Sequence, residues 1–237
     1  MPNEFHPGDV ISYIEMCLAV GTSLQRGMNY RLCGAESVIL MSRRIGAPYE
    51  DLIDDSGKIL TYEGHDCSKT LDCPDPKRFD QPERFPSGGL TQNGLFAASV
   101  TRYKKSGNPP ERVRVFEKIK DGIWVYNGIF ELLDYRSDDS NGRRVFKFIL
   151  GLVHSDNHWI NNDRGLAPDD DRIIPSWVKV AVWKRDKGMC QIPNCGAISG
   201  LHFDHIIPYS KGGSSKDPAN IQILCGRHNL GKRDRIE

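Results

Sequence analysis

The 237-residue sequence lacks the features of membrane-bound and secreted chains. No apolar run approaches the roughly 20 residues that a membrane-spanning helix needs. The N-terminal stretch MPNEFHPGDV has neither the basic start nor the apolar core of a secretory signal peptide. Internal repeats and low-complexity tracts are also absent from the sequence. We therefore expect a cytoplasmic, globular protein whose length suffices for two compact domains.

A disulfide framework is also not evident, because the seven cysteines are odd in number and scattered. In a reducing compartment, clustered cysteines are interpreted first as metal ligands. His65, Cys67 and Cys73 could form one such cluster, but no fourth ligand is evident, so we interpret them as part of a loop. The net charge of +1 is small but uneven, since basic residues are in excess from Arg172 onward and acidic residues before it. This asymmetry favours a phosphate-rich partner for the C-terminal part.

The first 153 residues alternate between β-forming segments and turn-forming clusters. Segments rich in Val, Ile, Phe and Tyr are separated by Gly, Asp, Ser and Asn, which predicts an antiparallel sheet that is curved or closed into a barrel. The expected strands are 36–42, 58–64, 113–119, 123–135 and 143–153. A helix is expected over 90–106, and the prolines of residues 65–89 indicate a long loop.

The remaining residues divide into a polar stretch and a small basic module. Residues 154–171 are rich in Asn and Asp without periodicity, which predicts a linker. Within 172–237 we expect a helix over 175–187, then two strands and a basic helix. The apolar face of the first helix is expected to comprise Trp177, Val180, Ala181 and Trp183. The predicted fold class is thus α+β, with domains at 1–153 and 172–237.

Two pairs of candidate zinc ligands lie in the C-terminal module. Cys190 and Cys195 form the first pair, and Cys225 and His228 form the second. Three thiolates and one imidazole would give a closed, tetrahedral and structural Zn²⁺ site. The alternative is three small buried cysteines and a surface histidine. Zinc is the favoured interpretation, because so short a module has little core of its own.

The stretch HFDHIIP, residues 202–208, places two histidines and an aspartate close together. The histidines could bind a metal as a pair, or one of them could act as a base beside a metal held by other residues. If His228 binds zinc, the polar residues that remain for a second centre are Asp204, His205, Asn220, Asn229 and Lys232.

This set resembles the HNH, or ββα-metal, nuclease family. The matching stretches are VWKRDKGMCQIPNC, LHFDHIIPYSKGG, NIQILC and RHNLGK, in the family's order and covering almost all of 172–237. The resemblance implies that His205 is the general base for phosphodiester hydrolysis. It also implies that Asp204 and Asn229 bind a single Mg²⁺ or similar divalent cation, which prefers oxygen ligands. Asp204 and His205 can serve one centre only if the strand becomes irregular at His205, because adjacent strand residues point to opposite faces.

The same resemblance gives the neighbouring residues supporting roles. Asn220 would brace the loop after His205, and Lys232 and Arg233 would contact phosphates. His202 falls at a variable position of the family and is expected to pack or to face solvent. Asn229 stands where the family's last catalytic histidine is usual, and its carbonyl oxygen can still bind a metal.

The first domain resembles the SRA domain, which flips modified cytosines out of DNA. The matching stretches include HPGDV, GAESVILMS, YEDLIDDSGKILTYEG and DQPERFPSGGLTQNGLFAAS, in order. A pocket for a flipped cytosine needs aromatic faces that stack on the base and a carboxylate that accepts its amino hydrogens. By the resemblance, Tyr49 and Tyr62 are the stacking pair, and the carboxylate is Asp51, with Asp54 as the alternative.

The resemblance also implies contacts from the backbone and from a loop. The base edge would meet the backbone near Met41, Ser42 and Glu63. The gap in the duplex would be filled by a loop of Thr91, Gln92 and Asn93. Two motifs depart from the family, since Tyr62-Glu63-Gly64 replaces Tyr-Thr-Gly and Tyr126-Asn127-Gly128 replaces Tyr-Asp-Gly. These departures leave open whether 5-methylcytosine, 5-hydroxymethylcytosine or a bulkier base is read.

Together the two resemblances predict a modification-dependent DNA endonuclease with a restriction role against modified foreign DNA. The expected partner is double-stranded DNA with modified cytosine, and the expected cofactors are structural Zn²⁺ and catalytic Mg²⁺ or a similar cation. One HNH centre cuts one strand, so double-strand cleavage favours a homodimer or successive binding events. The alternatives are an HNH endonuclease that does not depend on base modification and a non-catalytic reader of modified DNA.

Overall fold

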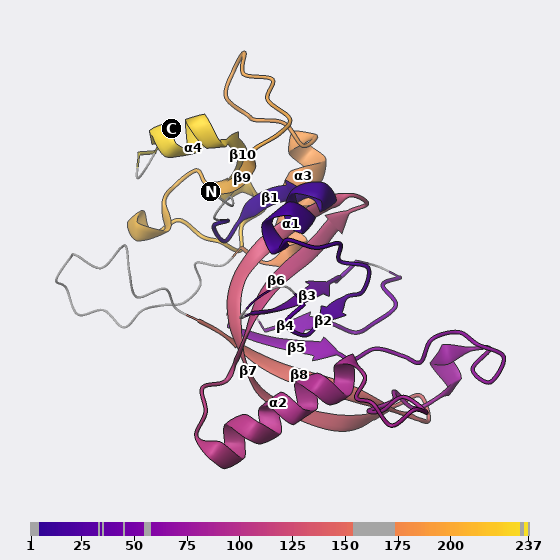
Figure 1. The fold of residues 1–237 in the computed structure, drawn as a ribbon. Helices are drawn as coiled ribbons and strands as arrows, with labels where there is room; N and C mark the ends of the chain where they lie inside the picture. Colours follow the sequence, from indigo (N-terminus) through magenta and orange to yellow (C-terminus); the bar gives the residue numbers. More distant parts are fainter. Residues whose placement is uncertain are drawn as a thin grey trace.

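The computed structural model describes residues 5–32, 34, 36–44, 46–54, 58–153, 174–232 and 235–236. These residues form a mixed α+β fold around a mostly antiparallel sheet (Figure 1), which confirms the expected fold class. The predicted linker, residues 154–171, and Arg233 lie outside the described residues. None of the described helices has the length and apolar character that crossing a lipid bilayer requires.

Ten strands and four α-helices make up the described fold. The strands are β1 (Asp9–Ser12), β2 (Met28–Asn29), β3 (Ser37–Met41), β4 (Leu52–Ile53), β5 (Ile59–Glu63), β6 (Glu111–Lys120), β7 (Ile123–Ser140), β8 (Arg143–Leu152), β9 (Leu201–His205) and β10 (Ile221–Cys225). The α-helices are α1 (Tyr13–Val20), α2 (Gln92–Ser106), α3 (Ser176–Asp186) and α4 (Gly226–Lys232). Three short 3-10 helices are η1 (Pro76–Arg78), η2 (Tyr209–Lys211) and η3 (Pro218–Asn220).

The long strand β7 organises the sheet. Its first half pairs with β1 and β6, and its second half pairs with β8. The main path runs β10-β9-β1-β7-β6-β3-β2, while β5 and β4 continue from β8. All pairings are antiparallel except that of β3 with β6. Bulges bend the strands, as expected for an extra residue in one partner. The described strands leave the path open, so the sheet is curved but not closed into a barrel.

Helix α2 covers one end of this sheet (Figure 1). It begins at the cap Thr91, whose side chain accepts a hydrogen bond from the backbone N–H of Gly94. The helix buries Phe96 and Val100 in a core shared with Phe148 of β8. The predicted helix over 90–106 is therefore confirmed almost to the residue.

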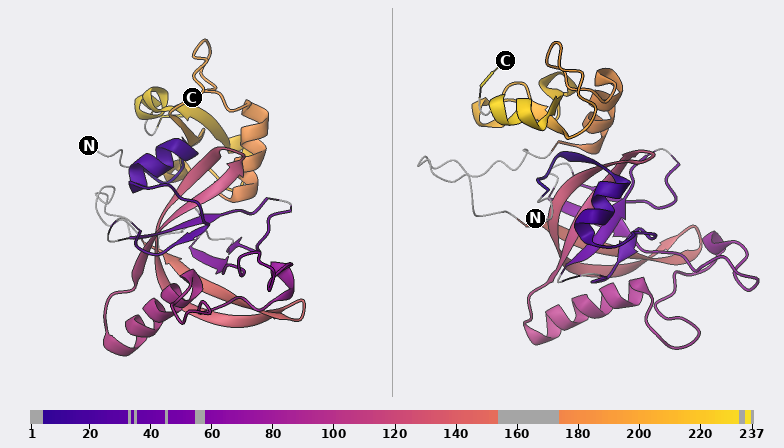
Figure 2. Two further views of the ribbon diagram at one scale, coloured as in Figure 1. Left: turned by 45° about the vertical axis from the view of Figure 1, so that its right-hand side comes forward. Right: turned by 45° about the horizontal axis from the view of Figure 1, so that its top comes forward.

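Residues 65–89 form the predicted long loop, which extends away from the sheet with η1 in it (Figures 1 and 2). A disulfide joins Cys67 and Cys73 in this loop. This pairing contradicts our expectation from the scattered cysteines. Because the two sulfurs bond to each other, the alternative metal site with His65 does not form.

Helix α3 follows Pro175, as predicted, and its apolar face is confirmed in part, because Val180 and Trp183 pack half-buried against the core. The buried side chains are those of Val178, Lys179, Val182 and Asp186 among others. Trp177, which we expected on the apolar face, is 55% exposed. The difference has a physical reason, because two of the buried residues are charged. Lys179 finds its partners on β6 and β7, and Asp186 pairs with the adjacent Arg185 and accepts from the Ile223 N–H.

The C-terminal module is joined to the sheet of the first domain, as the two views of Figure 2 show. β1 pairs with β7 on one side and with β9 on the other. One hydrophobic core contains Ile119 and Val125 from β6 and β7 together with Val178, Val182 and residues of β9 and β10. The small module therefore completes its core with side chains from the first domain.

Candidate functional site

The four predicted zinc ligands come together at the end of β10. The ligand atoms of Cys190, Cys195, Cys225 and His228 all lie within 4.8 Å of one another. His228 Nδ1 lies 3.4 Å from Cys190 Sγ and 3.3 Å from Cys225 Sγ, and the Sγ atoms of Cys195 and Cys225 are 3.9 Å apart. A zinc tetrahedron with bonds of about 2.0–2.3 Å has edges of about 3.5–3.8 Å. The donor set and its spacing therefore fit Zn²⁺.

Local structure explains why these ligands converge. Cys225 ends β10, and His228 lies one turn into α4. The backbone N–H of Cys190 donates to the carbonyl of Ala197, which closes the turn that carries Cys195. Burial raises the pKa of Cys190, whereas the backbone N–H of His228 lowers the pKa of Cys225. The lowered pKa of Cys225 favours the thiolate that zinc requires.

Asp204 and His205 are the last two residues of β9, at the opposite end of the β9–β10 pairing from Cys225, because His205 faces Ile221 and Leu201 faces Cys225. His205 Nε2 lies 2.8 Å from the hydroxyl of the buried Ser215. Since β9 ends at His205, the strand passes into a loop where we expected an irregular backbone. The carboxylate of Asp204 accepts from Gln222 Nε2 at 3.3 Å and pairs with Lys232 Nζ at 2.8 Å.

Asn220 makes the hydrogen bonds of a residue that braces a loop. Its side chain accepts from the Ile207 N–H at 2.9 Å and donates to the carbonyls of Ile207 and Ser214. Gly213 lies against the same side chain, and a Cβ there would come within 1.8 Å of the Ile207 carbonyl oxygen. The loop after His205 is thus fixed by one amide and by one obligatory glycine.

Lys232 is buried, although we expected it on the surface in contact with phosphates. It is only 1% exposed, and its ammonium contacts the Asp204 carboxylate and the His205 carbonyl. A buried, ion-paired lysine does not fit the predicted contact with phosphates. Asn229 is half-buried on α4, one turn before Lys232.

His202, expected to pack or to face solvent, has a defined partner. Its Nδ1 lies 2.7 Å from a carboxylate oxygen of Asp9, the residue that faces it across the pairing of β9 with β1. It therefore links the module to the first domain, and it is not part of a two-histidine metal site.

The predicted base pocket contains an unpredicted histidine. The ring of Tyr49 stacks on His65, with centroids 5.4 Å apart and an interplanar angle of 16°. Tyr62 is 1% exposed, and its hydroxyl lies 3.0 Å from His65 Nε2. Burial lowers the pKa of His65 to about 4, so the imidazole is neutral near pH 7. The two predicted stacking residues thus contact one neutral ring.

Asp51, the first choice for the pocket carboxylate, lies buried at the start of β4. Its oxygens accept from the backbone N–H groups of Ser42 at 3.0 Å and Glu63 at 3.2 Å. Burial raises the pKa of Asp51 to about 7, and these two N–H groups oppose the rise. The alternative, Asp54, is exposed and accepts from the Ile59 N–H. Burial and these backbone partners favour Asp51.

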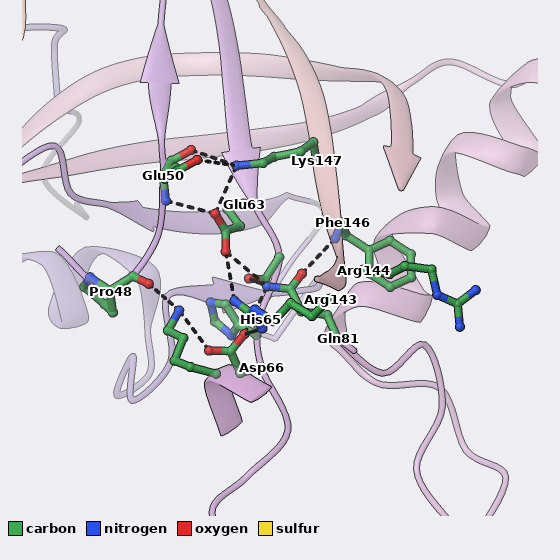
Figure 3. A network of polar contacts seen from close by, with 12 residues as sticks. Pro48, Glu50, Glu63, His65, Asp66, Gln81, Arg143, Arg144, Phe146 and Lys147 are labelled. Carbon is green, nitrogen blue, oxygen red and sulfur yellow. Dashed lines mark hydrogen bonds and ion pairs between the residues drawn. The ribbon is translucent and has the colours of Figure 1, made fainter. Parts of the chain in front are cut away.

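The side chain of Glu63 belongs to a buried ion network behind the pocket (Figure 3). It pairs with Lys147 Nζ at 3.0 Å and with Arg143 at 3.4 Å, and Arg143 also pairs with Asp66 at 2.6 Å. Gln81 donates to the Gly64 carbonyl at 2.7 Å. The network ties β5, β8 and the 65–89 loop together, and only the backbone of Glu63 turns toward Asp51.

Thr91, Gln92 and Asn93 do not form an exposed loop. Thr91 caps α2, Gln92 accepts from the Tyr30 N–H, and Asn93 is buried with hydrogen bonds to both the N–H and the carbonyl of His65. Such residues are not available to enter DNA. The sequence signal for this is the overlap of these residues with the helix predicted over 90–106, in which Thr91 is a suitable N-cap.

His65 and Ser215 were missed as site residues. His65 was considered only as a metal ligand, and Ser215 lies in a Gly- and Ser-rich turn with no distinguishing pattern. Both acquire their importance from side-chain contacts across loops, His65 with Tyr49 and Tyr62 and Ser215 with His205, which the sequence pattern does not reveal.

Residues 188–235 match the HNH endonuclease family, which confirms the resemblance for that part of the chain. No curated protein sequence gives a match. Two similar solved structures are complexes of the SUVH5 SRA domain. The complex with hemi-methylated CG DNA has 25% identity, a TM-score of 0.42, and covers 64% of this chain and 86% of that chain. The complex with fully hydroxymethylated CG DNA has 22% identity, a TM-score of 0.40, and coverages of 64% and 87%.

A third similar structure is the type IV phosphorothioation-dependent restriction endonuclease ScoMcrA. The match has 15% identity and a TM-score of 0.41, and it covers 98% of this chain and 52% of that chain.

Proposed function

We propose that this protein is a modification-dependent DNA endonuclease that captures a flipped, modified cytosine and cuts a nearby phosphodiester bond. The observation that carries the nuclease assignment is the HNH match over 188–235 together with the Cys/His cluster in the same module as Asp204 and His205. The capture assignment is supported by the buried Asp51 near two tyrosines.

In the proposed reaction, His205 takes the proton from the attacking water. The Ser215 hydroxyl orients the imidazole through Nε2, and Asn220 fixes the loop that follows it. A divalent cation held by the Asp204 carboxylate and the Asn229 amide oxygen would supply charge stabilisation at the phosphate. The cation would have to share the Asp204 carboxylate with the Lys232 ammonium, which pairs with it at 2.8 Å.

In the proposed pocket, a cytosine ring takes the place of the His65 imidazole between Tyr49 and Tyr62. The contacts of His65 with both tyrosines support this exchange, since a flat neutral ring already occupies the position. Asp51 accepts the amino hydrogens of the base, with the backbone of Ser42 and Glu63 beside it. Extruding a base costs a few kcal/mol, which stacking and these hydrogen bonds offset.

The gap left in the duplex is filled, in this proposal, from the 65–89 loop. Leu71 lies between the paired Cys67 and Cys73 and is fully exposed. An apolar side chain in this position can enter between base steps. Leu71 thus replaces Thr91, Gln92 and Asn93 as the residue proposed to fill the gap in the duplex.

Binding by a catalytically impaired variant tests the capture step separately from cleavage. We expect His205→Ala to bind a duplex with one 5-methylcytosine or 5-hydroxymethylcytosine more tightly than the same duplex with cytosine. Equal binding of all three duplexes would favour the nuclease that does not depend on modification. The relative affinity for the two modified duplexes would identify the preferred base.

A further inference from the structure

Within the described part of the chain, three side-chain polar contacts join the C-terminal module to the first domain, in addition to the strand pairing and the shared core. The pairing of β9 with β1 sets Asp9 opposite His202, and His202 Nδ1 lies 2.7 Å from a carboxylate oxygen of Asp9. Arg43 donates to the Ser176 hydroxyl at the start of α3 at 3.2 Å. The third link is made by Lys179.

Lys179 is a buried lysine whose partners all belong to the first domain. It is 3% exposed, and its ammonium donates to Asn127 Oδ1 at 2.6 Å and lies 3.4 Å from a Glu117 carboxylate oxygen. Asn127 in turn donates to Glu117 at 3.1 Å. Removing one partner of a buried ion pair leaves the other charge buried and unpaired, which is strongly unfavourable, so the attachment of α3 at this point needs Lys179 and its first-domain partners together.

The position of Asn127 results from a bulge in β7. In the pairing with β6, Tyr126 faces Phe116 and Gly128 faces Val115, which leaves Asn127 as the extra residue. Gly128 has a φ of 105°, a conformation that favours glycine. A bulge can redirect a side chain out of the regular alternation. Here it accompanies the contact of Asn127 with Lys179.

The same link lies beside the base pocket. Glu117 pairs across the sheet with Met41, and the next residue, Ser42, donates its N–H to Asp51. The contact of Lys179 with Glu117 is therefore connected to the Asp51 carboxylate through the strand pairing of Glu117 with Met41 and the hydrogen bond from the Ser42 N–H. On the other side, α3 packs on β10, and β10 pairs with the strand of Asp204 and His205.

We propose that these contacts, and not the length of segment 154–173, fix the distance between the base pocket and the nuclease centre. This inference rests on the proposed function. The cut then falls at one fixed number of nucleotides from the captured base, a distance that we call the offset. Lys179 is a positioning residue for cleavage. A module tethered only through a flexible chain would cut over a range of offsets.

The test maps cut positions on a long duplex that carries a single 5-methylcytosine. Wild-type protein should cut at one narrow offset. Inserting about ten Gly and Ser residues into 154–173 adds roughly 35 Å to the maximum span of this segment, yet the offset should stay unchanged. An offset that moves or spreads with the insertion overturns the proposal, as does a broad offset in the wild type.

Lys179→Met should broaden the offset, and Lys184→Met, on the exposed side of the same helix, should not. If Lys179→Met does not fold, Lys179→Met with Glu117→Gln removes the buried charge as well. A folded variant of either kind with an unchanged, narrow offset overturns the role of Lys179.

Hydrogen exchange of the DNA-free protein separates this proposal from the proposed function. The amides of β9 should exchange as slowly as those of β7, and Lys179→Met should accelerate β9 selectively. Fast exchange of β9 in the wild type overturns the fixed attachment. Slow exchange in a protein that cuts modified and unmodified DNA alike would contradict only the proposed function.

Discussion

Asp51→Asn should change how the stability of the protein depends on pH. Burial raises the pKa of Asp51 from 3.8 to about 7, so the folded state binds more protons than the unfolded state over that range. Stability that is present while the carboxyl stays neutral is therefore lost as pH rises from about 4 through about 7. A shift of about three units corresponds to about 4 kcal/mol in total. Between about pH 5 and pH 8, the expected loss is about 2.5 kcal/mol.

Asparagine has no charge in this range and should abolish that loss. The assay is urea unfolding of wild type and Asp51→Asn with zinc present, because contributions of all other groups cancel in the difference between the two proteins. Asp54→Asn, which changes an exposed carboxyl, is the matched control and should follow the wild type. If the stabilities of wild type and Asp51→Asn run parallel from pH 5 to pH 8, the reasoning about Asp51 is refuted.

Three other substitutions test separate parts of the site. Cys225→Ser should lose bound zinc, measured by elemental analysis, and unfold the C-terminal module, whereas Cys17→Ser should keep its zinc; a fully zinc-loaded Cys225→Ser would contradict the ligand assignment. His205→Ala should lower the rate of cleavage by about 10²–10⁴-fold, with duplex affinity and zinc content unchanged, and a smaller loss would remove it as the general base. His65→Ala should bind the modified duplex about five-fold more tightly, because the base no longer displaces a stacked ring from Tyr49; weaker binding would show that His65 holds the base instead.

The sequence was most informative where chemistry restricts the choice of residue. Zinc needs thiolates and imidazoles at short separations, so Cys190, Cys195, Cys225 and His228 could be predicted from spacing, and the structure assembles them. Asn220 was expected to brace a loop, and its three hydrogen bonds do so. The α+β class and helix α2 followed from the β-forming segments and the pattern around 90–106.

Residues whose roles depend on distant partners were not predictable. The buried face of α3 was predicted only in part, because Lys179 is buried through its pairing with Glu117 and Asn127, which no helical periodicity reveals. Lys232 was expected on a basic surface but is buried against Asp204. β1 has only four residues, so its pairing with β9 left no signal in the sequence.

The most direct test of the proposed function compares cleavage of one plasmid prepared with and without cytosine modification, in Mg²⁺ and with zinc-loaded protein. We expect the modified plasmid to be cut and the unmodified plasmid to remain intact, and His205→Ala to cut neither. Equal cleavage of the two plasmids by the wild type would contradict dependence on modification. If neither plasmid is cleaved, the assignment of endonuclease activity is contradicted.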